Sequence, residues 1–156
     1  MNTETTIEQN VQQVVPLFGV KDMQSAVKYY TKGLGFNMTH QWMPDGKLRW
    51  CNLQRDSANL MLQEFLKEGK HANVPKEKTG VGVSINFICN DALALYNEFI
   101  ARNIAVEEPF VGNNMWVIHL TDPDGYDIYF ESFTDVPEET KYSEWRREEG
   151  SLISEE

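Results

Sequence analysis

The chain of 156 residues has few cysteines, little positive charge and no long apolar run. Its two cysteines, Cys51 and Cys89, lack the partner spacing of a zinc or redox motif, so we expect buried thiols of a reducing compartment. The 14 Lys and Arg residues stand against 24 Asp and Glu, which gives a net charge of −10. This balance argues against nucleic-acid binding, because neutralising phosphates requires clustered cations.

Targeting signals and common catalytic motifs are also absent from the sequence. No segment has the length of a membrane span, and residues 1–13 are polar, so we expect a cytoplasmic protein with no signal peptide and no membrane partner. Ser84 has no Gly-x-Ser-x-Gly context and neither cysteine has a neighbouring base. There is no Gly-rich phosphate loop or dinucleotide-binding fingerprint either.

The composition predicts one globular domain. Hydrophobic residues make up 41% of the chain and aromatic residues 12%, and a chain of this length buries roughly 70% of its unfolded surface. We expect residues 1–12 to be a polar N-terminal extension. Residues 134–156 carry three pairs of adjacent glutamates, which predicts an acidic, solubilising C-terminal tail.

Residues 13–65 predict the element order β-α-β-β-β. A short β-type run at 14–20 precedes Asp22, which is a good helix N-cap, and Ala26, Tyr29 and Tyr30 follow at helical spacing. Strands are expected at 36–42, 47–54 and 59–65.

Residues 81–133 repeat this order after a linker at 66–80 that is rich in Lys, Gly and Pro. Asp91 is the second N-cap, a helix is expected at 92–102, and strands are expected at 81–89, 104–107, 115–120 and 126–132. An internal repeat of this kind implies two similar modules side by side, and therefore an α+β fold.

The last two strands form a hairpin whose return strand suits the wall of a pocket. The turn Asp122-Pro123-Asp124-Gly125 combines a proline that pre-sets φ with a glycine that supplies positive φ. Beyond the turn, Asp127, Tyr129 and Glu131 alternate with Ile128 and Phe130, so that two carboxylates and a phenol share one face.

Five segments of the chain form a recognisable combination: Val15-Pro16-Leu17-Phe18-Gly19-Val20-Lys21-Asp22-Met23, residues 26–30, Gly33-Leu34-Gly35-Phe36, Leu60-Met61-Leu62-Gln63-Glu64 and Asp122-Pro123-Asp124-Gly125-Tyr126. Together they resemble the vicinal oxygen chelate superfamily, which includes glyoxalase I, extradiol dioxygenases, fosfomycin-resistance thiol transferases and bleomycin-resistance proteins. The resemblance covers about residues 13–133. It implies two β-α-β-β-β modules whose curved sheets form a half-open cup, and a frequent homodimer.

In catalytic members of that superfamily the cup holds a divalent metal. The positions that match the usual ligands are Val15, Ser84, Tyr129 and either Met61 or Gln63. Valine cannot ligate a metal, and a neutral hydroxyl or phenol is a poor substitute for imidazole or carboxylate. We therefore expect no metal and no other cofactor, as in the metal-free, bleomycin-resistance-like members.

The residues expected to line the cup are mostly polar side chains of the second module, together with two tryptophans of the first. They are Ser84, Asn86, Val117, His119, Asp127, Tyr129, Glu131, Trp42 and Trp50. Two carboxylates and a phenol favour a cationic or hydrogen-bond-donating ligand. His119 either contacts the ligand, as a hydrogen-bond partner or a general base, or is a core histidine satisfied by Tyr129 or Glu131. Ser84 and Asn86 bind either the ligand or neighbouring groups.

Three functions remain open. The first is a small-molecule-binding or sequestering protein without a catalytic metal. The second is a glyoxalase-like lyase, an isomerase or a dioxygenase, with His119 or Glu131 as catalytic base or with a metal relocated to His119, Glu64 and Glu131. The third is an interaction module in which residues 140–156 recruit a partner. Tyr142, Trp145 and Leu152 would then dock either on their own domain or on a dimer mate.

Overall fold

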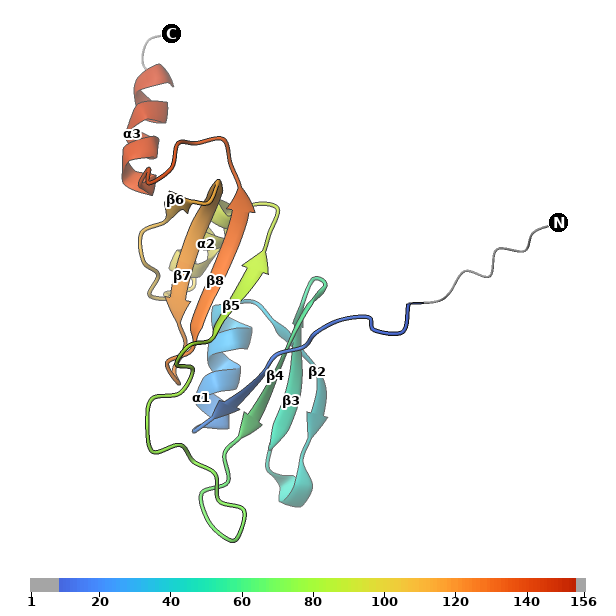
Figure 1. Cartoon of the computed structure of the whole chain (residues 1–156). Helices are drawn as coiled ribbons and strands as arrows, with labels where there is room; N and C mark the ends of the chain where they lie inside the picture. Colours follow the sequence, from blue (N-terminus) through green and yellow to red (C-terminus); the bar gives the residue numbers. More distant parts are fainter. Residues whose placement is uncertain (1–8, 154–156) are drawn as a thin grey trace, which may run out of the picture.

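A computed structural model of the chain describes residues 9–153 and the side chains of residues 9–151, and it consists of two β-α-β-β-β modules followed by a helix (Figure 1). The first module contains β1 (Leu17–Val20), α1 (Met23–Lys28), β2 (Asn37–Trp42), β3 (Trp50–Arg55) and β4 (Ala58–Glu64). The second contains β5 (Ser84–Ile88), α2 (Ala92–Ala101), β6 (Phe110–Gly112), β7 (Met115–Thr121) and β8 (Asp127–Phe133), and α3 (Tyr142–Ile153) follows. The predicted α+β fold of two repeated modules is confirmed.

Each module forms its own four-stranded sheet, and the two sheets have the same topology. The strand orders are β1-β4-β3-β2 and β5-β8-β7-β6. In each sheet the first strand pairs parallel with the last, with Leu17 opposite Met61 and Ser84 opposite Asp127, and the other pairs are antiparallel. One apolar core joins the buried faces of the two modules.

The first helix of each module begins at the predicted cap. The Asp22 carboxylate accepts the Ser25 N–H at 3.0 Å, and the Asp91 carboxylate accepts the Ala94 N–H at the same distance. The first helix then widens into a π-helical turn over Tyr29–Gly33. Gly35, with φ of 78°, reverses the chain beyond that turn.

The prediction of a strand at residues 104–107 is wrong, and β6 lies at Phe110–Gly112 instead. Asn113 and Asn114 have φ of 51° and 59°, which is the backbone of a two-residue hairpin turn joining β6 to β7. Asparagine tolerates this conformation, so the Asn-Asn pair is the sequence signal that marks the hairpin. Residues 104–107 instead form a connection whose Ile104 and Val106 pack against the core.

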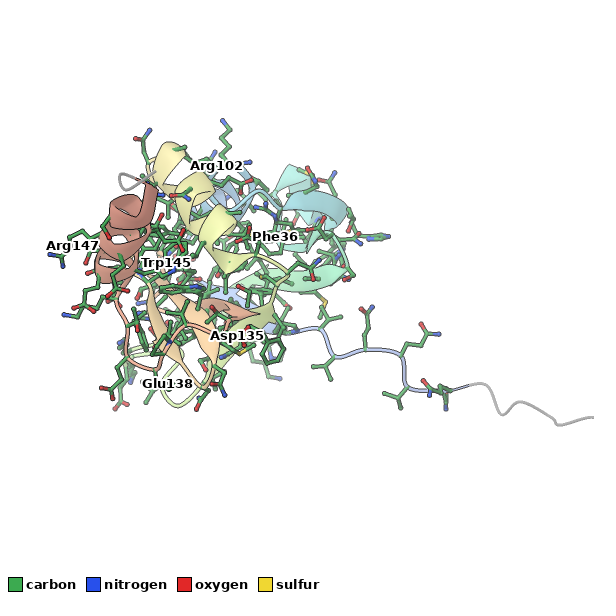
Figure 2. All side chains as sticks on the ribbon, turned by 90° about the horizontal axis from the view of Figure 1, so that it is seen from above. Phe36, Arg102, Asp135, Glu138, Trp145 and Arg147 are labelled. Carbon is green, nitrogen blue, oxygen red and sulfur yellow. The ribbon has the colours of Figure 1, made fainter. Side chains whose placement is uncertain are left out.

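Part of the expected acidic tail is an ordered helix. Trp145 and Tyr142 of α3 lie 5.6 Å and 6.2 Å from Trp116, ring centre to ring centre, and Tyr142 also contacts Tyr96. In Figure 2 Trp145 points toward the sheet and Arg147 away from it. The expected docking of Tyr142 and Trp145 is thus met by their own domain. The Leu152 side chain, residues 1–8 of the extension and residues 154–156 of the tail lie outside the described part of the chain.

The modules are joined at one end by the buried carboxylate of Asp122. It accepts the Tyr30 hydroxyl at 2.7 Å and the N–H groups of Asp124 and Tyr126, each at 2.9 Å. The Tyr126 hydroxyl donates to the Gly19 carbonyl at 2.9 Å. At the other end, Arg55 on β3 forms a bidentate pair with Glu98 on α2, at 2.6 Å and 3.1 Å.

Burial raises the pKa of Asp122, while its hydrogen bonds from Tyr30 and the backbone act in the opposite direction. Burial and the Asp122 charge raise the pKa of Tyr30 far above its usual range, so that Tyr30 stays a neutral phenol and donates. Among residues 9–153, no helix is long and apolar enough to cross a membrane.

We predict that Tyr30→Phe lowers the free energy of unfolding by about 1.5 kcal/mol, and that Asp122→Ala lowers it by about 2–3 kcal/mol, because both leave buried polar groups unpaired. Urea unfolding followed by circular dichroism measures both values. Tyr29→Phe is the matched control, since the Tyr29 hydroxyl makes only a long contact of 3.4 Å to the Thr121 carbonyl. Equal losses of unfolding free energy for Tyr30→Phe and Tyr29→Phe would contradict the role given to the Tyr30–Asp122 hydrogen bond.

Candidate functional site

The face of the second sheet that points away from the core carries the predicted polar residues of this module. We call it the cup face. Strand pairing places Asn86 opposite Tyr129, His119 opposite Tyr129, and Val117 opposite Glu131. The alternate residues, such as Ile118, Ile128 and Phe130, are buried in the core. The cup face therefore brings together Ser84, Asn86, Val117, His119, Asp127, Tyr129 and Glu131.

His119 is held between two carboxylates at the centre of this group. Its Nδ1 lies 2.9 Å from Glu107 Oε2 and its Nε2 lies 2.8 Å from Asp127 Oδ1. The imidazole also stacks on Tyr129, with ring centres 4.7 Å apart and an angle of 20° between the planes. Sequence reasoning missed Glu107, because it placed that residue in a strand instead of the connection that reaches His119.

These contacts favour the imidazolium form of His119. Partial burial lowers the pKa of His119, but the hydrogen bonds and charges of Glu107 and Asp127 outweigh it, and the net shift is upward. In the imidazolium form both ring N–H groups donate to carboxylates. Both ring nitrogens of His119 are therefore engaged by Glu107 and Asp127, and its ring stacks on Tyr129.

A second chain of hydrogen bonds runs beside His119 on the same face. The Ser84 hydroxyl donates to Asn86 Oδ1 at 3.2 Å, and Asn86 Nδ2 donates to Glu131 Oε1 at 3.3 Å. Burial and the charges of Asp127, Glu107 and Glu131 raise the pKa of Tyr129, which keeps its phenol neutral. The face thus presents a carboxylate, a phenol and the imidazole of His119 side by side.

Trp42 and Trp50 lie on the first sheet, directly opposite each other on β2 and β3. Trp42 is 55% exposed and Trp50 is half-buried. Within residues 9–151, no hydrogen bond or ring contact joins either indole to the His119 group. Strand pairing places both tryptophans on the first sheet, whereas the His119 group lies on the second.

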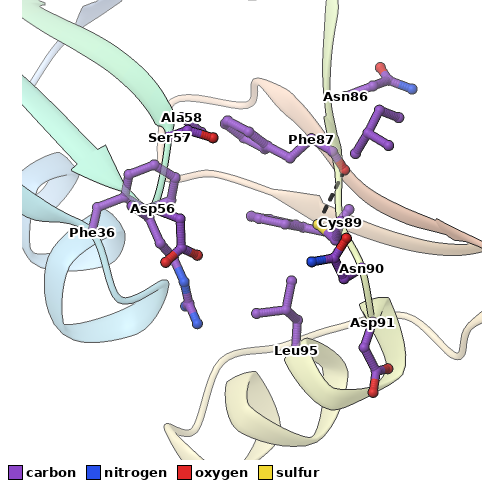
Figure 3. A pocket seen from close by; sticks show the side chains of 13 residues that line it. Phe36, Asp56, Ser57, Ala58, Asn86, Phe87, Cys89, Asn90, Asp91 and Leu95 are labelled. Atoms are coloured by element: carbon purple, nitrogen blue, oxygen red, sulfur yellow. Dashed lines mark hydrogen bonds between the residues drawn. The ribbon is translucent and has the colours of Figure 1, made fainter.

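A cavity of about 600 Å³ lies where the two modules meet, and its wall includes Asn86 at the edge of the cup face (Figure 3). Phe36 and Asp56 of the first module face Phe87 and Leu95 of the second across it. Cys89 is also part of the wall, and burial raises the pKa of its thiol. Sequence reasoning did not find this cavity, because its wall is formed by segments from two modules.

Comparison with known proteins identifies the family. The sequence model of the Glyoxalase/Bleomycin resistance protein/Dioxygenase superfamily matches residues 11–130. The chain belongs to this superfamily. No curated protein sequence matches the chain.

Three solved structures show the shared superfamily fold. TioX from Micromonospora sp. ML1 has 14% sequence identity and a TM-score of 0.63, and the match covers 79% of this chain and 99% of TioX. A glyoxalase/bleomycin resistance protein/dioxygenase from Nocardioides has 14% identity and a TM-score of 0.61, covering 85% and 90%. A domain of this type from Frankia sp. EAN1pec has 16% identity and a TM-score of 0.61, covering 81% and 96%.

The side chains at the superfamily's metal positions do not fit a divalent metal. Val15, Ser84 and Tyr129 supply no imidazole or carboxylate, and Met61 and Gln63 add only weak donors. Over the described residues, no group of three or more His, Cys, Asp or Glu side chains is arranged to hold a metal ion. The alternative set of His119, Glu64 and Glu131 does not converge, since Glu64 pairs with Arg49 at 3.3 Å beside α1.

We predict that His119 titrates above its ordinary value of 6.5, and that Glu107→Gln lowers its pKa. Because the folded pKa is the higher one, the stabilisation is complete below about 6.5 and is lost as the pH rises through the folded pKa. NMR titration of the imidazole and melting temperatures across this window measure the two effects. Glu139→Gln, an exposed carboxylate away from His119, is the control. A His119 pKa at or below 6.5 would disprove the carboxylate clamp.

Proposed function

We propose that the protein binds a small cationic or hydrogen-bond-donating molecule on the cup face and does so without a catalytic metal. The observation that carries the proposal is the locked state of His119, whose two ring nitrogens are both engaged by carboxylates. A group held in this way presents a fixed charge pattern and has no nitrogen left for proton abstraction. Recognition by shape and charge requires no further chemistry.

The charges and rings of the cup face support a cationic ligand. Glu131 uses one carboxylate oxygen to accept the Asn86 amide N–H, and its second oxygen accepts no hydrogen bond from residues 9–151, which leaves it to a ligand donor. Tyr129 offers a ring at the next position along the same strand face. Ile88, at 63% exposure, and Phe110, at 44%, supply apolar surface on the same face.

The adjoining cavity suits the uncharged part of such a ligand. Phe36, Phe87 and Phe130 line it, and Asn86 borders both the cavity and Glu131. A flat apolar group in the cavity would bury its surface there, and its cationic end would reach Glu131 past Asn86 at the edge strand β5.

A metal-free lyase or isomerase is the second candidate, and the free oxygen of Glu131 is the feature that favours it. In that reaction Glu131 would be the base, because His119 is already engaged on both sides. A dioxygenase would require a metal, and the donor set does not fit one.

We predict that a thermal-shift screen of flat organic cations finds a ligand that raises the melting temperature in a saturable way, as binding to the folded state alone requires. Glu131→Gln should weaken that ligand about tenfold or more, since a charge-assisted hydrogen bond is lost. Glu139→Gln is the matched control and should bind as the wild type does.

The same screen on chelator-treated protein includes Ni²⁺, Mn²⁺, Fe²⁺, Co²⁺ and Zn²⁺. A saturable rise with one of these metals would contradict the proposal and indicate a metal enzyme. Turnover of the ligand that is abolished in Glu131→Gln, with binding retained, would favour the lyase or isomerase.

We also propose that the protein is a homodimer. Phe133, at 78% exposure, leaves apolar surface at the end of β8 that a second copy would cover. Light scattering after size-exclusion chromatography is expected to give twice the chain mass of 18.0 kDa. A monomer mass at all concentrations would exclude the dimer.

A further inference from the structure

A basic groove lies beside α1, on the side of the first sheet that this helix covers. Its volume is about 800 Å³, and the cationic side chains in its wall are Lys28, Lys32, Lys47, Arg49 and Lys67. They come from α1 and the π-helical turn, from the connection before β3, and from the segment after β4. We call this feature the basic groove.

The groove is unusual because the protein as a whole is acidic. Five of the chain's 14 Lys and Arg residues line it, against two of its 24 Asp and Glu residues, Asp22 and Glu64. Asp22 caps α1 and Glu64 pairs with Arg49. The four lysines form no ion pair with any described residue, so their ammonium groups are available to a partner.

The cations of the groove come from three segments of the chain, so an extended acidic peptide can meet several of them along its length. Alternate side chains of an extended peptide are about 6–7 Å apart. Lysine also binds phosphate as a point charge, and tripolyphosphate is therefore the competing ligand in the test. The one arginine of the groove is already paired with Glu64.

The wall of the groove also contains apolar side chains. Met23 is buried, and Val27 and Leu48 are half-buried. An apolar side chain flanked by carboxylates would match both the apolar and the cationic parts of this wall. We propose that the basic groove binds an acidic peptide segment of a partner protein that carries an apolar residue among its carboxylates.

This proposal is independent of the proposed function, because the groove borders α1 and the cup face belongs to the second sheet. Non-specific attraction does not account for such binding, since the net charge of −10 repels an acidic peptide elsewhere. The binding should weaken as salt rises, because the charges are exposed.

The experiment uses fluorescence anisotropy with the labelled peptide Asp-Glu-Glu-Leu-Glu-Glu-Asp and the full chain. The variant Lys28→Glu with Lys32→Glu should bind about tenfold more weakly or worse, as reversing two charges of the groove predicts. Lys47→Glu with Lys67→Glu tests the cations that come from outside α1 and the π-helical turn. The control Lys70→Glu with Lys76→Glu makes the same charge change at exposed linker positions and should bind as the wild type does.

Four outcomes would overturn the proposal. They are no binding to the wild type, equal losses in the groove and linker variants, equal binding of a peptide with glycine in place of leucine, and tighter binding of tripolyphosphate than of the peptide. Melting temperatures of all variants establish that they are folded.

Discussion

The two modules depend on each other through the buried carboxylate of Asp122. A buried carboxylate is tolerated only when its oxygens are hydrogen-bonded. Two of its three donors are N–H groups of its own turn, and the third is the Tyr30 hydroxyl of the other module. The shape of the β7–β8 turn and the docking of the modules are therefore set by the same residue.

The positions of the cup-face residues follow from that turn. The hydrogen bond from the Asp122 N–H to the Tyr126 carbonyl starts the register that places His119 opposite Tyr129 and Thr121 opposite Asp127. A shift of one residue would turn these side chains toward the core. The clamp on His119 then needs only Glu107, which the connection before β6 supplies.

Charge is divided between two surfaces of the molecule. The cup face combines Glu107, Asp127 and Glu131 with one histidine, whereas the groove beside α1 gathers five cations. The first module thus presents a cationic surface on a chain whose net charge is −10. Each surface favours partners of the charge opposite to its own, because bringing like charges together costs binding free energy.

The sequence alone determined the repeated element order, both N-caps and the alternation along β7 and β8. These features depend on residues near one another in the chain, such as Asp22 with Ser25 or the turn that begins at Asp122. The Asn113-Asn114 turn was equally local, and its signal was present but missed. The sequence alone also shows that the side chains of Val15 and Ser84 are not metal ligands of the usual kind.

Tertiary structure alone decided which distant residues meet. Glu107 and His119 are in contact although they lie 12 positions apart in the sequence, and Tyr30 and Asp122 are in contact although they lie 92 positions apart. The cavity and the basic groove are likewise built from segments far apart in the chain. Local propensity carries no information about such contacts, because they depend on how the sheets pack and on which connection covers which face.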